Sequence, residues 1–298
     1  MNRVQLHPVV DPRPMEASAP CNDDFDTVFR EDTDAYDAGT GELLFKFRKN
    51  VLSRTELPRE VFGNITSEMK PSMTRNSAAG KVDLERLRTI RPDITGIVQV
   101  NKMGTQAKVT VDRGKGEKTL SEAICNPVQS YKAGYTYWRF RGGVAMPTGF
   151  TKEFPEKWAQ VVPFFNEIGD VFEREMPEKA AMHRHHFREW EDYLIGTSPL
   201  STAAININYE SAYHKDRGDF PDGFSTLAVV ETGDYDGGFY VLPAYRIAID
   251  VRNGDLLMSQ SHRHFHGNTS ITKKSDGARR MSVVTYLKAN VPRATIRK

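Results

Sequence analysis

The sequence has little cysteine, with only Cys21 and Cys125 among 298 residues. Two cysteines so far apart in the chain cannot build a disulfide framework or a cysteine-rich zinc site. Any metal ion bound by this protein is therefore expected to use histidine, aspartate or glutamate side chains.

Long hydrophobic runs are missing as well. The apolar stretches fall far short of the roughly 20 residues that cross a bilayer. The opening MNRVQLHPVVDPRP also lacks the apolar segment of a signal peptide. We therefore expect a soluble, intracellular protein, nuclear if eukaryotic and in the host cytoplasm if viral.

Neither sign of charge predominates. The formal net charge is +2, so the whole-molecule field does not indicate a nucleic-acid partner, although local basic patches remain compatible with one. Hydrophobic residues make up 39% and charged residues 27% of the chain. These values are ordinary for a globular protein and exclude a collagen-like or wholly disordered chain. We expect a folded monomer.

The chain divides into three segments by its pattern. Residues 1–40 are rich in Pro, Asp and Asn without a sustained period, which predicts a loosely ordered N-terminal arm. Residues 41–130 contain the strand-like runs GELLFKFRKNVL, ITGIVQVNKM and QAKVTVD, and are expected to form an N-terminal extension packed on the core. Residues 131–298 are expected to form the main domain.

Two helices are expected before the second half of the chain. Apolar residues recur at three- and four-residue spacing between Pro155 and Glu175, and Pro155 suits a first helical turn. A second helix is predicted from Pro177 to Ile195, with Gly196 placed to end it.

After Ser198 the pattern changes to short β-rich runs. These runs are TAAININY, STLAVVET, GGFYVLPAYRIAIDV, GDLLMSQSHRHFH and RMSVVTYLKA, with turn signals between them. Helices followed by five or more strands indicate an α+β fold in which helices back a jelly roll.

Three residues of this half could hold a metal ion. His214 and Asp216 lie two apart at the end of a strand-like run, so their side chains are expected to project to one face. His266, further along, could return to the same place. Two imidazoles and one carboxylate leave three positions open on octahedral iron, enough for a bidentate 2-oxo acid and dioxygen. A His-x-Asp pair alone, however, more often marks a hydrogen-bonded surface turn.

A possible carboxylate clamp strengthens this hypothesis. In the strand-like RRMSVVTYLK, Arg280 and Ser282 share a face, and the planar fork of an arginine pairs bidentately with a carboxylate. Arg279 points to the other face and is expected to meet solvent. The plain alternative is an exposed arginine on an edge strand.

The order of these residues resembles the TET/JBP family of Fe(II)/2-oxoglutarate nucleic-acid dioxygenases, which are built on a double-stranded β-helix. The matching elements are His-x-Asp, then HGNT about fifty residues later, then R-x-S-V-V-x-Y. The resemblance covers roughly residues 200–290.

The resemblance implies oxidation of the 5-methyl group of a pyrimidine in DNA, either 5-methylcytosine or thymine. It assigns the iron to His214, Asp216 and His266, and 2-oxoglutarate to Arg280 and Ser282, with dioxygen consumed and ascorbate as a possible reductant. His262, His264 and His266 alternate and so would share one strand face. Spacing therefore leaves all three as candidate ligands, and only the HGNT match selects His266.

The sequence defines the identity of the target base less well than it defines the metal and 2-oxoglutarate sites. Asp219 falls where the family has a polar residue touching the target base, and an aspartate could accept from cytosine N4 or from thymine N3. Lys288 stands where cytosine-oxidising members typically have histidine, which weakens the case for methylcytosine. A solvated strand end is an equally plain reading of Lys288.

DNA chemistry of this kind requires a flipped base and an aromatic surface. Tyr137 and Arg141, in the stretch KAGYTYWRFRGG, could contribute to it, although such aromatic clusters are more often core. His183, His185 and His186 are expected to be helix-surface histidines, because no cysteine or acid accompanies them at a ligand spacing.

Two other functions remain open. The same triad serves hydroxylases of protein side chains or small molecules, since fold does not fix substrate. A non-catalytic jelly-roll binding module would also fit the strand pattern, but it would have no use for a 2-oxo acid clamp.

Overall fold

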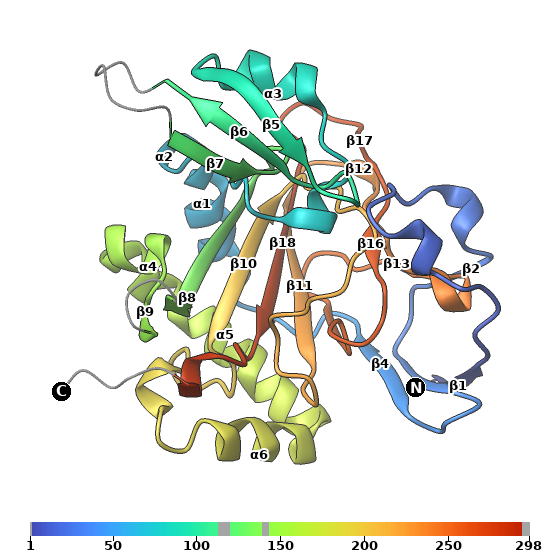
Figure 1. Cartoon of the computed structure of the whole chain (residues 1–298). Coiled ribbons are helices and arrows are strands. Elements are labelled where there is room, and N and C mark those ends of the chain that lie inside the picture. The colour runs from blue at the N-terminus through green and yellow to red at the C-terminus, as the bar shows by residue number, and fades with distance from the viewer. Residues whose placement is uncertain (1, 113–119, 139–142, 294–298) are drawn as a thin grey trace.

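The computed structural model describes residues 2–112, 120–138 and 143–293 (Figure 1). Within these residues the largest sheet has nine strands. In spatial order they are β1 (Asn2–Leu6), β3 (Thr33–Asp37), β4 (Leu43–Arg48), β15 (Leu256–Ser259), β11 (Ser225–Thr232), β18 (Arg279–Tyr286), β10 (Thr202–Ile207), β8 (Ser130–Trp138) and β9 (Val144–Pro147). The four central strands thus come from the second half of the chain.

A second, smaller sheet packs on one face of this sheet. Its strands are β16 (Gly267–Asn268), β13 (Tyr240–Leu242), β14 (Ile247–Ile249) and β2 (Thr27–Phe29). The strands β12 (Tyr235–Gly237) and β17 (Ile271–Lys273) pair with each other in a separate two-stranded sheet. Buried residues of the two sheets, such as Leu227 and Leu257 with Tyr240 and Ile247, form one hydrophobic cluster. Two facing sheets with helices behind confirm the predicted jelly roll.

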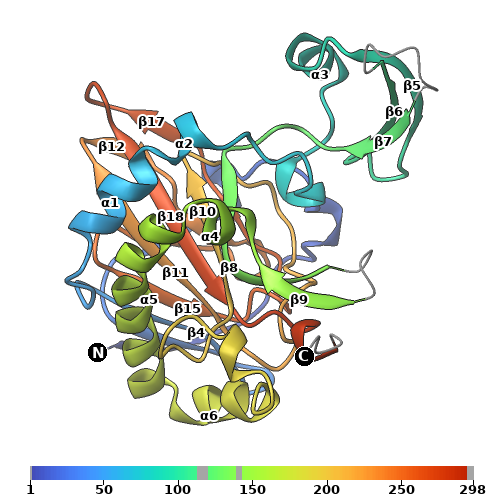
Figure 2. The same ribbon diagram turned by 90° about the vertical axis from the view of Figure 1, so that its left-hand side faces the viewer.

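Helices cover the opposite face of the large sheet. They are α1 (Glu56–Gly63), α2 (Ile65–Glu68), α4 (Gly149–Glu153), α5 (Pro155–Glu175) and α6 (Pro177–His186). Figure 2 shows α5 running along the sheet. Phe165 and Phe172 of α5 belong to the same hydrophobic cluster as Met281 and Val283 of β18. Because side chains alternate along a strand, Arg280 and Ser282 face the other way, toward the interior between the sheets.

The two predicted helices are both present, but the second is shorter than expected. The apolar periodicity of α5 is confirmed, with Val161, Phe165, Ile168 and Phe172 buried. The prediction that α6 runs on to Ile195 is wrong, because α6 ends at His186. Turns and a short 3-10 helix follow it. Such turns also place residues three apart on one side, so the periodicity alone could not distinguish them from a helix.

A separate small layer lies at one end of the molecule. It consists of α3 (Leu84–Ile90) and a three-stranded sheet of β5 (Ile94–Val100), β6 (Ala107–Val111) and β7 (Leu120–Ile124). Both views show this layer set off from the main sheet (Figures 1 and 2). Leu87, Val109 and Val111 belong to its own hydrophobic cluster. The strand predictions for residues 43–48, 94–100 and 107–111 are confirmed.

The first 40 residues are more structured than a loose arm. β1 pairs in parallel with β3 in the large sheet, and β2 pairs in parallel with β14 in the small one. The division of the chain into three segments stays a prediction. Both cysteines are free thiols. In the part of the chain that the structure describes, no helix combines the length and apolarity needed to cross a membrane.

Candidate metal centre

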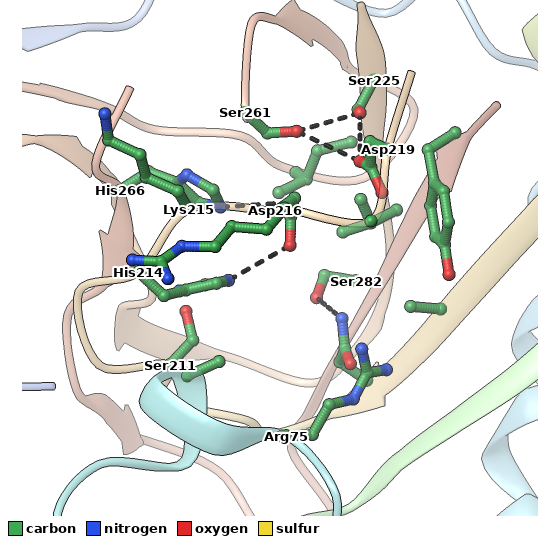
Figure 3. A pocket seen from close by; sticks show the side chains of 18 of the residues that line it. Arg75, Ser211, His214, Lys215, Asp216, Asp219, Ser225, Ser261, His266 and Ser282 are labelled. Carbon is green, nitrogen blue, oxygen red and sulfur yellow. Dashed lines mark hydrogen bonds and ion pairs between the residues drawn. The ribbon is translucent and has the colours of Figure 1, made fainter. Parts of the chain in front are cut away.

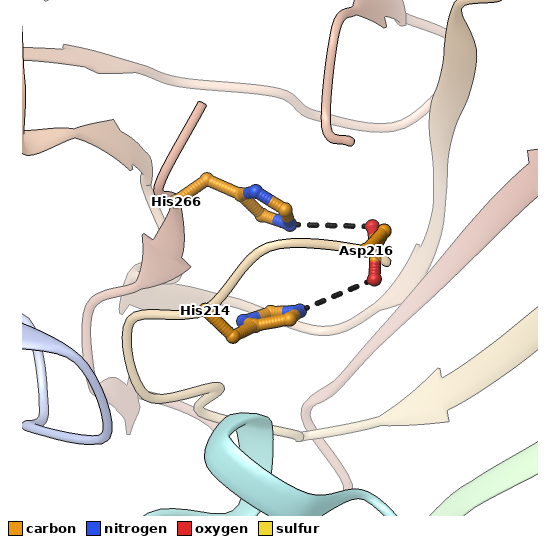
Figure 4. Close-up of side chains that lie close together, drawn as sticks. All are labelled: His214, Asp216 and His266. Carbon is orange, nitrogen blue, oxygen red and sulfur yellow. Dashed lines mark ion pairs between the residues drawn. The ribbon is translucent and has the colours of Figure 1, made fainter. Parts of the chain in front are cut away.

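His214, Asp216 and His266 converge at one point of the interior (Figure 4). One ligand atom from each lies within 4.8 Å of the others. The Asp216 carboxylate oxygens lie 3.5 Å from Nε2 of His214 and 3.4 Å from Nε2 of His266. The structure thus brings together the three residues that the sequence pattern indicated, but their local structure differs from the expected strand.

The expected strand at His214 and Asp216 is absent, which corrects the sequence interpretation. His214 forms only an isolated antiparallel bridge with His266, and a turn follows in which Asp219 N–H donates to Asp216 O. The Asp216 N–H instead donates to Ser261 O at 3.0 Å. The three side chains therefore converge because of the His214–His266 bridge and the bond from Asp216 N–H to Ser261 O, not because of alternation along one strand.

Each histidine is held by its other ring nitrogen. Nδ1 of His214 lies 2.8 Å from Ala212 O, and Nδ1 of His266 lies 3.1 Å from His264 O. A carbonyl can only accept, so each Nδ1 carries a proton, and each Nε2 faces Asp216 and can bind a metal ion that displaces any proton there. This donor set, two imidazole nitrogens and a carboxylate, fits ferrous iron with open coordination positions.

The carboxylate is held in its charged form. Burial alone would raise the pKa of Asp216, but hydrogen bonds with His214 and His266 and their charges hold that pKa well below its usual range. A deprotonated acid is the form that binds a metal cation.

The prediction that His262, His264 and His266 share one strand face is wrong. Residues 261–264 form a turn, because the N–H groups of Arg263 and His264 both donate to Gln260 O. His262 Nδ1 instead lies 3.0 Å from Asp216 O, and His264 packs edge-on to Tyr245. Only His266 of the three is close to the other two candidate ligands.

A cavity of about 330 Å³ opens beside these three residues (Figure 3). Its floor is formed by β10, β11 and β18, including Asn206, Leu227 and Ser282, and its walls by residues 74–78 and 209–219. Polar lining dominates the end away from the histidines, with Asp219, Ser225, Ser261, Lys132 and Lys288.

Arg280 is not among the described residues that line this cavity, but strand alternation puts it on the same face of β18 as the lining residues Ser282, Val284 and Tyr286. Its side chain is only 1% exposed. In the part of the chain that the structure describes, neither Nε nor Nη2 of Arg280 has a hydrogen-bond partner. A buried guanidinium with unpaired donors is costly unless an anion completes it. The exposed Arg279 instead donates to Gly63 O.

The two expected base-contacting residues lie at the polar end. Asp219 and Lys288 form an isolated antiparallel bridge, and Asp219 Oδ2 accepts from Ser225 Oγ at 2.8 Å. Burial, followed by the nearby Asp216 carboxylate, raises the pKa of Asp219 well above its usual range. Lys132 joins them from β8. Its pKa is lowered to about 8, mainly by desolvation and then by the charges of Arg75 and Lys288.

The other two expected DNA contacts are Tyr137 and Arg141. Arg141 lies outside the described residues, and Tyr137 packs with Ala145, Phe187 and Trp190 rather than among the described lining residues. The expectation that His183 is a surface residue is wrong. It is fully buried and stacked on Phe172, at 5.3 Å between ring centroids.

Sequence reasoning missed Arg75, which lines the cavity from the start of the 3-10 helix Asn76–Ala79. It comes from the segment whose placement could not be predicted, and no local pattern marks it. The isolated bridge between Ser72 and Val128, close to the start of β8, and the bond from Arg75 to Ser130 bring this part of the chain to the cavity.

Comparison with known proteins gives a consistent result. The family model Tet_JBP, described as the oxygenase domain of the 2OGFeDO superfamily, matches residues 141–289, half of the chain. The chain is 30% identical over 146 residues to the bifunctional helicase and thymine dioxygenase JBP2 of Trypanosoma brucei brucei, covering 48% of this chain and 13% of that protein. It is 27% identical over 249 residues to the thymine dioxygenase JBP1 of Leishmania major, covering 79% of this chain and 30% of that protein.

Among solved structures, NgTET1 in complex with 5mC DNA has a similar fold. The TM-score is 0.52 at 12% sequence identity, and the match covers 98% of this chain and 84% of that chain. The similarity thus extends beyond the family segment into the N-terminal half. The chain spans less than a third of the length of the curated relatives named above.

Proposed function

The chain belongs to the Tet_JBP family of 2OGFeDO oxygenase domains, and from this premise we propose that it is an Fe(II)- and 2-oxoglutarate-dependent dioxygenase that oxidises the 5-methyl group of a pyrimidine in DNA. The observation that carries the proposal is the convergence of His214, Asp216 and His266 within 4.8 Å, beside a cavity. The buried Arg280, on the face of β18 that lines the cavity, would hold the co-substrate.

Nε2 of His214, Nε2 of His266 and an oxygen of Asp216 would hold the ferrous ion. When bound, the metal supplies the redox chemistry that couples oxidation of 2-oxoglutarate by dioxygen to hydroxylation of a methyl group. The protein fixes the ligands in advance through the two Nδ1 hydrogen bonds. Tyr240 stacks on the His266 ring at 5.2 Å and limits its rotation.

Arg280 and Ser282 would bind the far carboxylate of 2-oxoglutarate. The guanidinium of Arg280 is buried, and its free Nε and Nη2, judged within the described residues, are suited to a bidentate contact. Ser282 lines the cavity two residues along the same strand face, so its hydroxyl can donate to the same carboxylate.

The polar end of the cavity would read the base. A methyl group inside a duplex cannot reach a buried metal, so the target nucleotide must leave the stack. Lys132 and Lys288 offer ammonium donors, and Asp219 offers an acceptor. Thymine and 5-methylcytosine each present two acceptors and one donor on this edge, so this set of side chains fits either base. The relatives named as thymine dioxygenases favour thymine, and 5-methylcytosine is the competing substrate.

Mass spectrometry of nucleosides tests the proposal. Two DNA substrates, one without and one with 5-methylcytosine, are incubated with enzyme, Fe(II), 2-oxoglutarate and ascorbate as reductant. Both contain thymine. We expect new hydroxymethyluracil, and hydroxymethylcytosine if methylcytosine is the substrate, together with stoichiometric succinate. The Asp216→Ala variant serves as the blank.

The same assay separates the rival functions. DNA-independent succinate that rises with a peptide or small molecule, without any modified nucleoside, would identify a hydroxylase of another target. Absence of succinate under every condition, from protein shown to contain the metal, would leave only a binding role.

A further inference from the structure

A row of polar side chains crosses three neighbouring strands at the floor of the cavity. Nη2 of Arg75 donates to Ser130 Oγ on β8. Ser130 Oγ donates in turn to Asn206 Oδ1 on β10 at 2.5 Å, and Asn206 Nδ2 donates to Ser282 Oγ on β18 at 3.4 Å. The last contact is visible in Figure 3, with Arg75 beside it.

The sheet register makes this row rigid. Ser130 and Asn206 are paired across β8 and β10, and Asn206 and Ser282 are paired across β10 and β18. Their exposed fractions are 3%, 8% and 5%. Buried hydrogen bonds of this kind are strong, because water cannot easily replace a missing partner.

The row has a direction because an arginine can only donate. Donation by Arg75 occupies a lone pair of Ser130, whose own proton then goes to the carbonyl oxygen of Asn206. That contact fixes the Asn206 amide with its NH₂ group toward Ser282. Ser282 Oγ therefore accepts from Asn206, and its own hydroxyl proton is left for a group inside the cavity.

We propose that Arg75 is a positioning residue for the co-substrate: through Ser130 and Asn206 it orients the Ser282 hydroxyl to donate to a carboxylate of 2-oxoglutarate. The inference rests on the proposed function, and it assigns a role in the oxygenase site to a residue outside the family segment 141–289. Arg75 does not itself need to touch the co-substrate in this role.

Binding of 2-oxoglutarate measured without turnover tests the inference. The full chain is loaded with Mn(II) in place of iron, oxygen is excluded, and the Kd for 2-oxoglutarate is measured by calorimetry. Loss of one oriented hydrogen bond to a charged group predicts an increase in Kd of about tenfold. We expect an increase of this size for Arg75→Met and for Ser130→Ala, and a partial return toward the wild-type Kd for Arg75→Lys, which still only donates.

The comparison of these two variants separates orientation from charge. Ser130→Ala breaks the row but keeps the guanidinium of Arg75. If Arg75→Met raises the Kd for 2-oxoglutarate and Ser130→Ala does not, the effect of Arg75 is purely electrostatic and the inference is overturned. Arg86→Met is the control for loss of a positive charge, because Arg86 is exposed on α3 and is not among the described residues that line the cavity. Its Kd for 2-oxoglutarate is expected to remain within about twofold of wild type.

A double-mutant cycle completes the test. In a Ser282→Ala background the hydroxyl is gone, so adding Arg75→Met should change the Kd no further; full additivity would contradict the inference. Circular dichroism and Mn(II) stoichiometry show which variants are folded. If the wild-type protein binds Mn(II) but not 2-oxoglutarate, the proposed function fails first, whereas wild-type binding with unchanged variants refutes only the role of Arg75.

Discussion

His214 and His266 are joined by two reciprocal backbone hydrogen bonds, from His214 N to His266 O at 2.9 Å and from His266 N to His214 O at 3.0 Å. The pair sets their ring centroids 4.3 Å apart. Because this spacing is fixed by the main chain, the two imidazoles are preorganised before any metal arrives, and side-chain replacements there should leave the fold intact.

Replacing His214 or Asp216 with alanine is expected to abolish stoichiometric metal binding and to lower turnover by more than about 100-fold. Each removed group is one of the three donor residues found at the centre among the residues that the structure describes. Metal content after dialysis and the circular dichroism melting curve would measure the two effects separately.

His264→Gln is the matched control for these variants. His264 lies near the centre in sequence but packs on Tyr245 instead, so the variant should keep one metal per chain. Normal metal content in Asp216→Ala, or its loss in His264→Gln, would contradict the assignment of ligands.

Arg280→Met is expected to remove the stabilisation that 2-oxoglutarate gives to the folded protein. For the wild type, 2-oxoglutarate at about 100 times its Kd should add about 2.7 kcal/mol to the free energy of unfolding. The ligand-free variant should be at least as stable as wild type, because a buried guanidinium with unpaired donors is costly. Urea unfolding with Mn(II), with and without 2-oxoglutarate, measures both effects.

Arg279→Met provides the comparison for Arg280→Met. The two arginines are adjacent on β18 but face opposite ways, and Arg279 is exposed. The variant should therefore retain the full response to 2-oxoglutarate. An equal loss in both variants would show that general charge, rather than a clamp at Arg280, binds the co-substrate.

Oxidation of DNA is expected to decline as the pH rises through about 8. Desolvation, then Arg75 and Lys288, lower the pKa of Lys132 to about 8. The ammonium group would thus lose its proton, and its ability to donate to the base, above that pH. The measurement is kcat/KM on DNA between about pH 6.5 and 9, since this ratio reports groups of the free enzyme.

Two variants identify the group behind that decline. Lys132→Met should lower kcat/KM on DNA and remove the alkaline limb, whereas Lys132→Arg should keep activity to higher pH because its charge persists. An unchanged alkaline limb in Lys132→Met would assign it to another group.

Acid should destabilise the folded chain between about pH 6.5 and 4. Burial lowers the pKa of His183 to about 4, as it does for His264. Between pH 4 and 6.5 the unfolded state binds more protons at these positions, so stability is lost as the pH falls through this window. A shift of this size corresponds to about 3 kcal/mol per histidine.

His183→Phe tests the contribution of this one side chain. Phenylalanine can keep the stacking on Phe172 without a titrating nitrogen. The variant should show a shallower fall in the free energy of unfolding over that pH window. Identical slopes in the two proteins would mean that His183 is already protonated or solvated in the folded state.

Local patterns in the sequence predicted the strand face of Arg280 and Ser282 and the extent of α5. Period-two alternation placed Arg280 and Ser282 on one face of β18, and three- and four-residue spacing gave α5 its full length. These patterns are set by local backbone geometry, so they can be recognised within one continuous segment of the sequence.

What could not be predicted depends on contacts between distant segments. The alternating histidines after Ser261 looked like a strand, but competing hydrogen bonds to Gln260 O make a turn. Arg75 carries no local signal, because its place at the cavity is set by contacts with residues far along the chain, namely the bridge from Ser72 to Val128 and its own bond to Ser130. Only the assembled sheet relates such residues to one another.

The order of strands in the large sheet has a consequence for how this oxygenase can be divided. Its central strands from the second half are bordered on both sides by earlier segments, β4 against β15 and β8 against β10. A fragment cut to residues 141–289 would leave two rows of unsatisfied main-chain groups, which favour aggregation. The catalytic half therefore cannot be transplanted alone into another protein, and its sheet can close during synthesis only with strands that left the ribosome long before it.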